Sequence, residues 1–345
     1  MRIGIASDVP AKVRALRKWV MEGTRHHVVW TATDVTEAAR LAADRMADLV
    51  LLDVPLGGVA APEATRQIVA ASPCPILIVT DSVQANTAAV FEAMGQGALD
   101  AVDIPPPDAE STGQGIRPFL TRVDRLSRLI GDADGTPAGI GAGKPAPGTH
   151  LVAIGASAGG PAALATLLAG LPKNFPAAIV IVQHVDAQFA AGLVDWLGRH
   201  SKMPVRLAAG GDLPTDGSVF VAGTGDHLVV KPTGHFSYCA EPEDHVYRPS
   251  IDVFFQSVHR DWRGGAVGVL LTGMGRDGAA GLKQLHDQGR HTIAQDEASS
   301  ALYGMPKAAA AIGAATEILP IDRIAARLID LVRVSQSRHP VRQTV

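Results

Sequence analysis

Cysteine is scarce in this sequence, and charge of neither sign is in marked excess. The two cysteines among 345 residues, Cys74 and Cys239, lie far apart and lack the spacing of a metal site. A disulfide scaffold and a cysteine-rich metal fold are thereby excluded, and both residues are typical of small core side chains in a reducing compartment. The formal net charge is −3, so the whole chain has no signal for binding nucleic acid or an anionic membrane.

Long hydrophobic runs are absent as well. No segment has the uninterrupted apolar length of a membrane span, and the first residues do not form a signal-peptide pattern. We therefore expect a cytoplasmic protein without direct membrane insertion. What the chain does have is 47% hydrophobic residues, which over 345 positions predicts about two domains, each with a sizeable core.

A composition break divides the chain. Residues 131–149 are rich in glycine, proline and alanine and offer little to bury, which indicates a flexible linker. The predicted organisation is therefore an N-terminal domain over residues 1–130, this linker, and a C-terminal domain over residues 150–345.

The N-terminal domain alternates strand and helix patterns. Five such units in about 130 residues predict a flavodoxin-like α/β sheet. The predicted strands are 2–6, 27–31, 49–52, 76–79 and 98–102. Asp8 follows the first strand, Asp53 ends the third and Thr80 ends the fourth, so we expect all three at the carboxyl edge of the sheet.

The C-terminal domain has short, unalternating apolar runs, which are typical of strands buried on both faces of a parallel sheet. The predicted strands are 151–155, 177–183, 204–208, 218–222, 266–272, 291–294 and 315–319. An antiparallel hairpin is predicted over residues 227–239, with Pro-Thr-Gly at its turn. We expect a doubly wound, mostly parallel α/β sheet with this hairpin added.

Three residues with reactive side chains come at the ends of predicted strands in this second domain. Ser157 lies in a glycine-rich strand-to-helix turn, His184 ends the next run, and Asp277 follows the run that begins at residue 266. Because the carboxyl ends of parallel strands share one edge, we expect the three to meet there. A serine, a histidine and an aspartate in this arrangement predict nucleophilic acyl transfer.

Each residue also has a simpler interpretation. Ser157 would serve as a helix cap, His184 as an ordinary rim histidine, and Asp277 as the N-cap of a helix beginning near residue 279. One rival function is a dinucleotide-binding oxidoreductase, although the second strand ends in Gln183 and His184 and lacks the acidic residue that would bind a ribose. A second rival is a non-catalytic signalling scaffold that binds receptors.

Five ordered blocks of the sequence resemble the signature segments of the chemotaxis protein-glutamate methylesterases, the CheB family. These are residues 155–160, 183–184, 248–252, 271–278 and 294–306. With the N-terminal domain and the linker, the resemblance covers nearly the whole chain. Residues 1–10, and the absence of a lysine at position 104 after the fifth predicted strand, look more like the branch found in surface-sensing, Wsp-type pathways than like flagellar chemotaxis.

The resemblance implies hydrolysis of glutamate methyl esters, and deamidation of selected glutamines, on methyl-accepting chemoreceptors. Ser157 matches the nucleophile, His184 the base and Asp277 the third member of the triad. The backbone N–H groups of Ser157 or Met274 are candidates to hold the oxyanion, and the reaction is expected to need no cofactor. Arg248 and Asp252 are expected to have a structural role, and the protein is expected to be a monomer.

The N-terminal domain resembles a response-regulator receiver domain. Asp53 matches the phosphoacceptor, Thr80 matches the switch hydroxyl, and Asp8 with Asp53 would hold Mg²⁺. The chain departs from the pattern at Ser7, where the family has a second carboxylate, and at Ile104, where it has a lysine. We expect Asp53 to be phosphorylated by a sensor histidine kinase and to regulate the enzyme; the alternative is a pseudo-receiver that acts by docking alone.

Overall fold

The computed structural model of the chain describes residues 1–44, 47–72, 74–83, 85–105, 114–131, 150–243 and 245–338. Contacts divide the chain into two compact units, Met1–Ala133 and Asp134–Val345. The predicted linker, apart from its first residue, lies outside the described residues. Within these ranges, no helix combines the length and apolar character needed to cross a membrane.

The first unit is a five-stranded sheet in the order β2-β1-β3-β4-β5, and every pairing in it is parallel. The strands are β1 (Arg2–Ala6), β2 (His27–Ala32), β3 (Leu49–Asp53), β4 (Ile76–Thr80) and β5 (Asp100–Asp103). This order confirms the flavodoxin-like prediction. The fifth strand begins two residues later than predicted.

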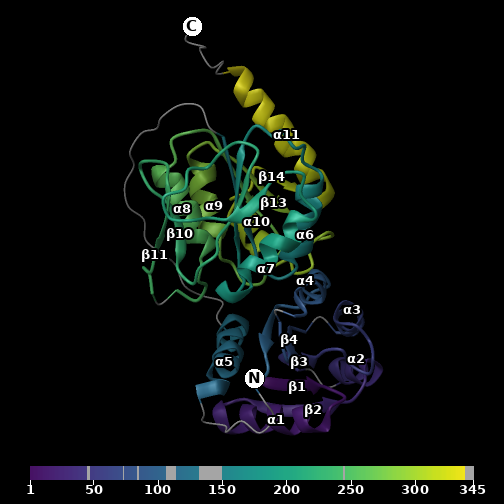
Figure 1. Ribbon diagram of the computed structural model, residues 1–345. Helices are drawn as coiled ribbons and strands as arrows, with labels where there is room; N and C mark the ends of the chain where they lie inside the picture. The colour runs from purple at the N-terminus through teal and green to yellow at the C-terminus, as the bar shows by residue number, and fades with distance from the viewer. Residues whose placement is uncertain are drawn as a thin grey trace. The chain divides into compact units, whose positions relative to one another are not determined.

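Helices cover both faces of this sheet (Figure 1). They are α1 (Pro10–Gly23), α2 (Val35–Asp44), α3 (Ala61–Ala71), α4 (Thr87–Gly95) and α5 (Arg117–Gly131), with the short 3₁₀ helix η1 (Gln114–Ile116) before the last. Helix α1 packs beside α5, and α2, α3 and α4 pack in a row. Strands β3 and β4 are buried along their whole length, because helices on both sides exclude water.

The second unit is a seven-stranded sheet in the order β14-β13-β12-β6-β7-β9-β8, again with only parallel pairings. The strands are β6 (Leu151–Ala156), β7 (Ala178–Gln183), β8 (Val205–Leu207), β9 (Val219–Val221), β12 (Ala266–Leu270), β13 (His291–Gln295) and β14 (Glu317–Leu319). Strands β10 (His227–Val230) and β11 (Phe236–Cys239) form the predicted antiparallel hairpin as a sheet of their own.

Two groups of helices pack in this unit. The helices are α6 (Gly160–Ala169), α7 (Ala187–Gly198), α8 (Ile251–Asp261), α9 (Ala279–Asp287), α10 (Met305–Ala311) and α11 (Ile321–Arg338). Helix α9 contacts both α8 and α10, whereas α6 contacts both α7 and α11 (Figure 1). Aromatic side chains of α8, Phe254 and Phe255, lie in the core with residues from β6 and β7.

The sheet has a topological switch point between β6 and β12. From β6 the chain passes to β7 on one side, and only later returns to β12 on the other. Loops leaving neighbouring strands diverge at such a point, and the crevice between them is the usual ligand site of open α/β sheets. Ser157 follows β6 and Asp277 belongs to the loop after β12, so both lie at the carboxyl edge beside this switch point.

Candidate active site

Ser157 stands at the first position after β6. Its backbone N–H donates to the carbonyl of Thr272 at 3.0 Å, which continues the contact of β6 with β12 past their last registered pair, Gly155 and Leu270. The residue is 8% exposed, and helix α6 is capped by Gly159, so Ser157 is not a helix cap. The Ser157 hydroxyl makes no hydrogen bond within the described part of the chain.

Strand register sets His184 beside Ser157. The partner of Ala156 across the sheet is Gln183, and the N–H of His184 donates to the Ala156 carbonyl at 3.0 Å. The Gln183 side chain then joins the two segments, because its Nε2 lies 2.8 Å from the Ser157 carbonyl oxygen and 3.2 Å from that of His184. Adjacent strand ends and a shared amide thus hold the serine and the histidine as neighbours.

Asp277 completes the cluster from the opposite side. Its Oδ2 lies 2.8 Å from Nε2 of His184 and accepts the N–H of Ile251 at 2.7 Å. Its Oδ1 accepts the Ser250 hydroxyl at 2.9 Å and the N–H of Asp252 at 3.1 Å. The carboxylate therefore sits on the N-terminus of α8, where free backbone N–H groups and the helix dipole favour a negative charge.

Two buried carboxyl groups at this helix end have pKa values shifted in opposite directions. Burial would raise the pKa of Asp277, but the hydrogen bonds from His184 and from the backbone of Ile251 and Asp252 outweigh it and hold this pKa below its ordinary value. Burial, followed by the nearby charge of Asp277, raises the pKa of Asp252 to about 7. The pair therefore keeps its negative charge on the carboxyl group that faces His184.

The ionised Asp277 also selects the tautomer of His184. A carboxylate only accepts hydrogen bonds, so Nε2 carries the proton and Nδ1 keeps the lone pair. Tyr247 lies flat on the imidazole, with ring centroids 4.1 Å apart and 13° between the planes. Its hydroxyl donates to the Met274 carbonyl at 3.2 Å. The tyrosine thus connects the histidine to the glycine-rich loop that follows β12.

That loop, residues 272–278, passes close to Ser157. A Cβ on Gly273 would stand 2.7 Å from the Ser157 Cβ, so only glycine permits this approach. The Ser157 N–H is already bound to Thr272 and is directed into the sheet pairing rather than towards a ligand. The N–H of Met274 makes no hydrogen bond within the described residues, which leaves Met274 as the better of the two predicted oxyanion donors.

The guanidinium group of Arg248 makes structural contacts with three residues. Its guanidinium pairs with Asp226 at 2.9 Å and donates to the carbonyl oxygens of Gly225 and Glu243. Asp252 accepts the N–H of Gly281 at 2.6 Å, which ties the start of α8 to α9. Both sets of contacts agree with the structural role expected from the sequence.

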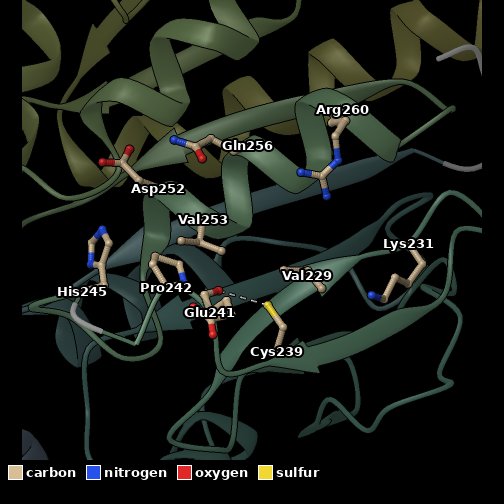
Figure 2. A pocket seen from close by; sticks show the side chains of 10 residues that line it. All are labelled: Val229, Lys231, Cys239, Glu241, Pro242, His245, Asp252, Val253, Gln256 and Arg260. Atoms are coloured by element: carbon tan, nitrogen blue, oxygen red, sulfur yellow. Dashed lines mark hydrogen bonds between the residues drawn. The ribbon is translucent and has the colours of Figure 1, made fainter. Parts of the chain in front are cut away.

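A cavity of about 350 Å³ lies between the hairpin and α8, and residues from the first turn of α8 to its last turn line it (Figure 2). Lys231 and Arg260 stand towards one end of it and Asp252 towards the other (Figure 2). Ser157, His184 and Asp277 do not line this cavity. Among the described residues that line it, Asp252 contacts the cluster directly, because its backbone N–H binds Asp277.

In the first unit, Asp53 ends β3 at the carboxyl edge, as predicted, and it is 2% exposed. Its Oδ2 accepts the Ser7 hydroxyl at 2.7 Å and its Oδ1 lies 3.1 Å from Nζ of Lys12. Thr80 ends the neighbouring strand, and its hydroxyl accepts a hydrogen bond from Asn86.

The residues predicted to hold Mg²⁺ are engaged with other groups. Both oxygens of Asp53 accept from Ser7 and Lys12, and Oδ2 of Asp8 accepts the N–H of Gly57 at 3.0 Å. Mg²⁺ requires near-octahedral oxygen ligands, and the described residues contain no group of three or more acidic, histidine or cysteine side chains able to hold a metal. The arrangement therefore does not fit a prepared Mg²⁺ site.

Sequence reasoning missed four residues that this geometry brings forward: Lys12, Gln183, Tyr247 and Ser250. Gln183 carried a signal, since it adjoins His184 at a strand end. Lys12 carried another, because it is a cation in the first turn of α1, a turn without acidic residues. Ser250 lies in the signature block 248–252, but nothing in the sequence indicates its hydrogen bond to Asp277. Tyr247 had no signal that separates it from other loop residues, because its role depends on its contact with His184.

Known proteins resemble this chain along nearly all its length. The CheB methylesterase family model matches residues 152–328, and the response regulator receiver domain model matches residues 3–108. A protein-glutamate methylesterase/protein-glutamine glutaminase of Burkholderia thailandensis is 51% identical over 342 residues, covering 98% of this chain and 99% of the relative. One of Pseudomonas fluorescens is 52% identical over 335 residues, covering 96% and 99%.

A solved structure resembles the second unit. The crystal structure of the Thermotoga maritima CheB methylesterase catalytic domain is 34% identical to this chain, with a TM-score of 0.50. The match covers 53% of this chain and 98% of that one.

Proposed function

Because this chain belongs to the CheB methylesterase family and is a protein-glutamate methylesterase/protein-glutamine glutaminase with a receiver domain, we propose that Ser157, His184 and Asp277 perform its hydrolysis. The supporting observation is the contact of the Asp277 carboxyl group with Nε2 of His184, next to the strand end that carries Ser157. A serine hydroxyl is a weak nucleophile at neutral pH, and a neutral imidazole, whose second nitrogen carries a lone pair, is the base that activates it.

The chemistry begins at Nδ1 of His184. This nitrogen takes the hydroxyl proton as the Ser157 oxygen attacks the γ-carbonyl carbon of the methyl ester. The imidazolium that forms is stabilised by Asp277, which is already ionised. In apo enzymes such catalytic hydrogen bonds are often long and tighten only with substrate, which accounts for the unbound Ser157 hydroxyl.

The tetrahedral intermediate then collapses. The Met274 N–H donates to its oxyanion, an interaction typically worth about 3 kcal/mol. His184 returns the proton to the departing methoxide, which leaves as methanol, and the acyl group remains on Ser157. Water, activated by the same histidine, releases glutamate. On a glutamine side chain the leaving group is ammonia. Every step uses a side chain or a backbone N–H, so we expect the ester step to need no metal or cofactor.

We infer the substrate from the methylesterase domain and the regulation from the receiver domain. We assign methyl-accepting chemoreceptors as the protein substrate and Asp53 as the residue phosphorylated by the sensor histidine kinase of the pathway. The receiver domain, tethered through residues 131–149, limits access of the bulky receptor to Ser157, and phosphorylation shifts the population towards the open state. The kinship with the surface-sensing branch stays a prediction.

The decisive test compares wild type with Ser157→Ala for methanol release from methylated receptor membranes. We expect loss of release on substitution, whereas Ser201→Ala, just past the end of α7, keeps it. Ester hydrolysis that survives Ser157→Ala would contradict the assignment. If the full-length proteins are all inactive, the fragment 149–345 repeats the comparison without the receiver domain; an inactive wild-type fragment would favour the scaffold interpretation.

A further inference from the structure

The phosphoacceptor site lacks the positive charge that the receiver pattern has after the fifth strand. Ile104 stands at that position, is 8% exposed, and donates its backbone N–H to the carbonyl of Thr80 at 2.8 Å. An aliphatic side chain cannot bind the phosphoryl oxygens. A site that accepts a phosphoryl group therefore needs a cation from another part of the chain.

Lys12 of helix α1 lies close enough to Asp53 to be that cation. Its Nζ lies 3.1 Å from Oδ1 of Asp53 and 2.9 Å from Oδ1 of Asp81, the residue directly after β4. The Lys12 side chain is only 14% exposed, and that of Asp53 is 3% exposed. Such a pair is screened by water much less than a surface ion pair.

The helix itself gives no reason for a lysine here. Lys12 is the third residue of α1, in a first turn that contains no acidic residue. A positive charge at a helix N-terminus opposes the helix dipole, which favours anions. Burial alone would lower the pKa of Lys12, but the hydrogen bonds to Asp81 and Asp53 outweigh it and raise the pKa, so the ammonium stays charged. The carboxylates of the β3 and β4 ends account for this lysine.

We propose that Lys12 binds the phosphoryl group formed on Asp53, in place of the lysine absent at Ile104. The proposal rests on the assignment of Asp53 as the phosphoacceptor. Transfer from a phosphoramidate-type donor, such as a phosphohistidine, breaks the donor's P–N bond and forms a P–O bond to a carboxylate oxygen of Asp53. The leaving nitrogen takes the electron pair and a proton from water. Lys12 neutralises the added charge on the phosphoryl oxygens.

Lys12 also connects phosphorylation to the neighbouring loop. The same ammonium contacts Asp81, whose side chain is 78% exposed and which adjoins Thr80, the predicted switch residue. A phosphoryl dianion on Asp53 attracts the ammonium more strongly than an exposed carboxylate does. Phosphorylation therefore loosens the Lys12–Asp81 contact and releases Asp81, the residue next to Thr80, from it.

The experiment measures phosphoryl uptake by the full-length protein from phosphoramidate, followed by intact mass and by phosphate-affinity gels. We expect Lys12→Gln to lower the rate of uptake about tenfold or more, because a charge-assisted hydrogen bond is lost. Lys12→Arg, which keeps the charge, is expected to retain most uptake. Lys18→Gln, an exposed lysine of the same helix, is the matched control and should behave as wild type.

Two further variants separate the possible failures. Asp53→Asn should abolish uptake, and adding Ile104→Lys to Lys12→Gln should restore it by returning a lysine to the family position. Equal labelling of wild type and a folded Lys12→Gln protein would overturn the role of Lys12 and leave Asp53 assigned. Wild type that stays unlabelled, or labelling that survives Asp53→Asn, would overturn the phosphoacceptor assignment and this inference with it.

Discussion

At the scale of single residues, Asp277 shows how one side chain serves both structure and chemistry. The sequence offered two interpretations, a triad member or the N-cap of α9. The structure gives α9 a glycine cap, Gly278, and directs the Asp277 carboxylate to the N-terminus of α8 instead. The prediction that Asp277 caps α9 was therefore wrong, because its carboxylate binds the N-terminus of α8. Because the same carboxylate also binds His184, its position on α8 fixes the orientation of the imidazole.

Asp252 gives a pH-dependent prediction at this scale. Its pKa is raised from 3.8 to about 7, chiefly by burial, so the folded protein binds a proton that the unfolded chain has released. Stability from this group is present below the ordinary pKa and is lost as the pH rises through about 7. As the pH rises from 3.8 to about 7, wild type loses this stability and Asp252→Asn does not. We therefore expect the Tm of Asp252→Asn to increase relative to that of wild type over this pH range.

Calorimetry over that pH range checks the expectation. Asparagine keeps the oxygen that accepts from Gly281, so the comparison isolates the charge. Asp195→Asn, at an exposed position of α7, is the control and should give a difference that does not change with pH. A Tm difference for Asp252→Asn that is equally flat would argue against a raised pKa at this residue.

At the scale of elements, the loop after β12 is shaped by close approach. Strand pairing carries the chain from Thr272, bound to Ser157, directly into Gly273. The carbonyl of Gly273 accepts the N–H groups of Gly304 and Met305, so the loop is held against the start of α10. A segment fixed at both sides cannot move away from a larger side chain without breaking these hydrogen bonds.

Gly273→Ala tests this element. The new methyl group would stand 2.7 Å from the Ser157 Cβ and 2.3 Å from the Met305 sulfur, so Ser157 or the loop must shift. A displacement of this kind at a reacting centre typically costs about a hundredfold in rate, and we expect that loss in kcat for methanol release. Gly198→Ala, where a methyl group meets nothing within 4 Å, should retain activity. Normal kcat in a folded Gly273→Ala protein would mean that the loop does not position the reacting groups.

At the scale of the whole molecule, the two units have separate sheets and cores, and they carry separate chemistry. Such a division permits regulation by access, because one domain can hinder a protein substrate without altering the catalytic residues of the other. We predict that removal of residues 1–148 raises the specific activity on receptor membranes, with little change in the hydrolysis of a small soluble methyl ester.

Parallel assays of the full-length protein and the fragment 149–345 on the two substrates check this. A rise on both substrates would mean that the receiver domain acts on the catalytic residues themselves. An unchanged or lower activity of the folded fragment on membranes would argue against inhibition by the receiver domain.

The sequence by itself determined the two α/β domains, the strands and the chain positions of the reactive residues. Hydrophobic periodicity, turn residues and buried apolar runs are local properties, and they predicted every strand of both sheets. The largest displacement of a strand end is two residues, at β5, β12 and β14. The carboxyl ends of parallel strands meet at one edge, so the proximity of Ser157 and His184 also followed from strand order.

Only the tertiary structure decided which groups share a hydrogen bond. Lys12 reaches Asp53 from 41 residues away, and Asp277 reaches the start of α8 from 26 residues away. The first turn of α1 marks Lys12 as unusual, but no local pattern shows the partner in either contact, because each partner depends on how a helix end packs over a strand end. The same packing buries Asp252 beside Asp277 and thereby separates their pKa values, which no property of the isolated segments determines.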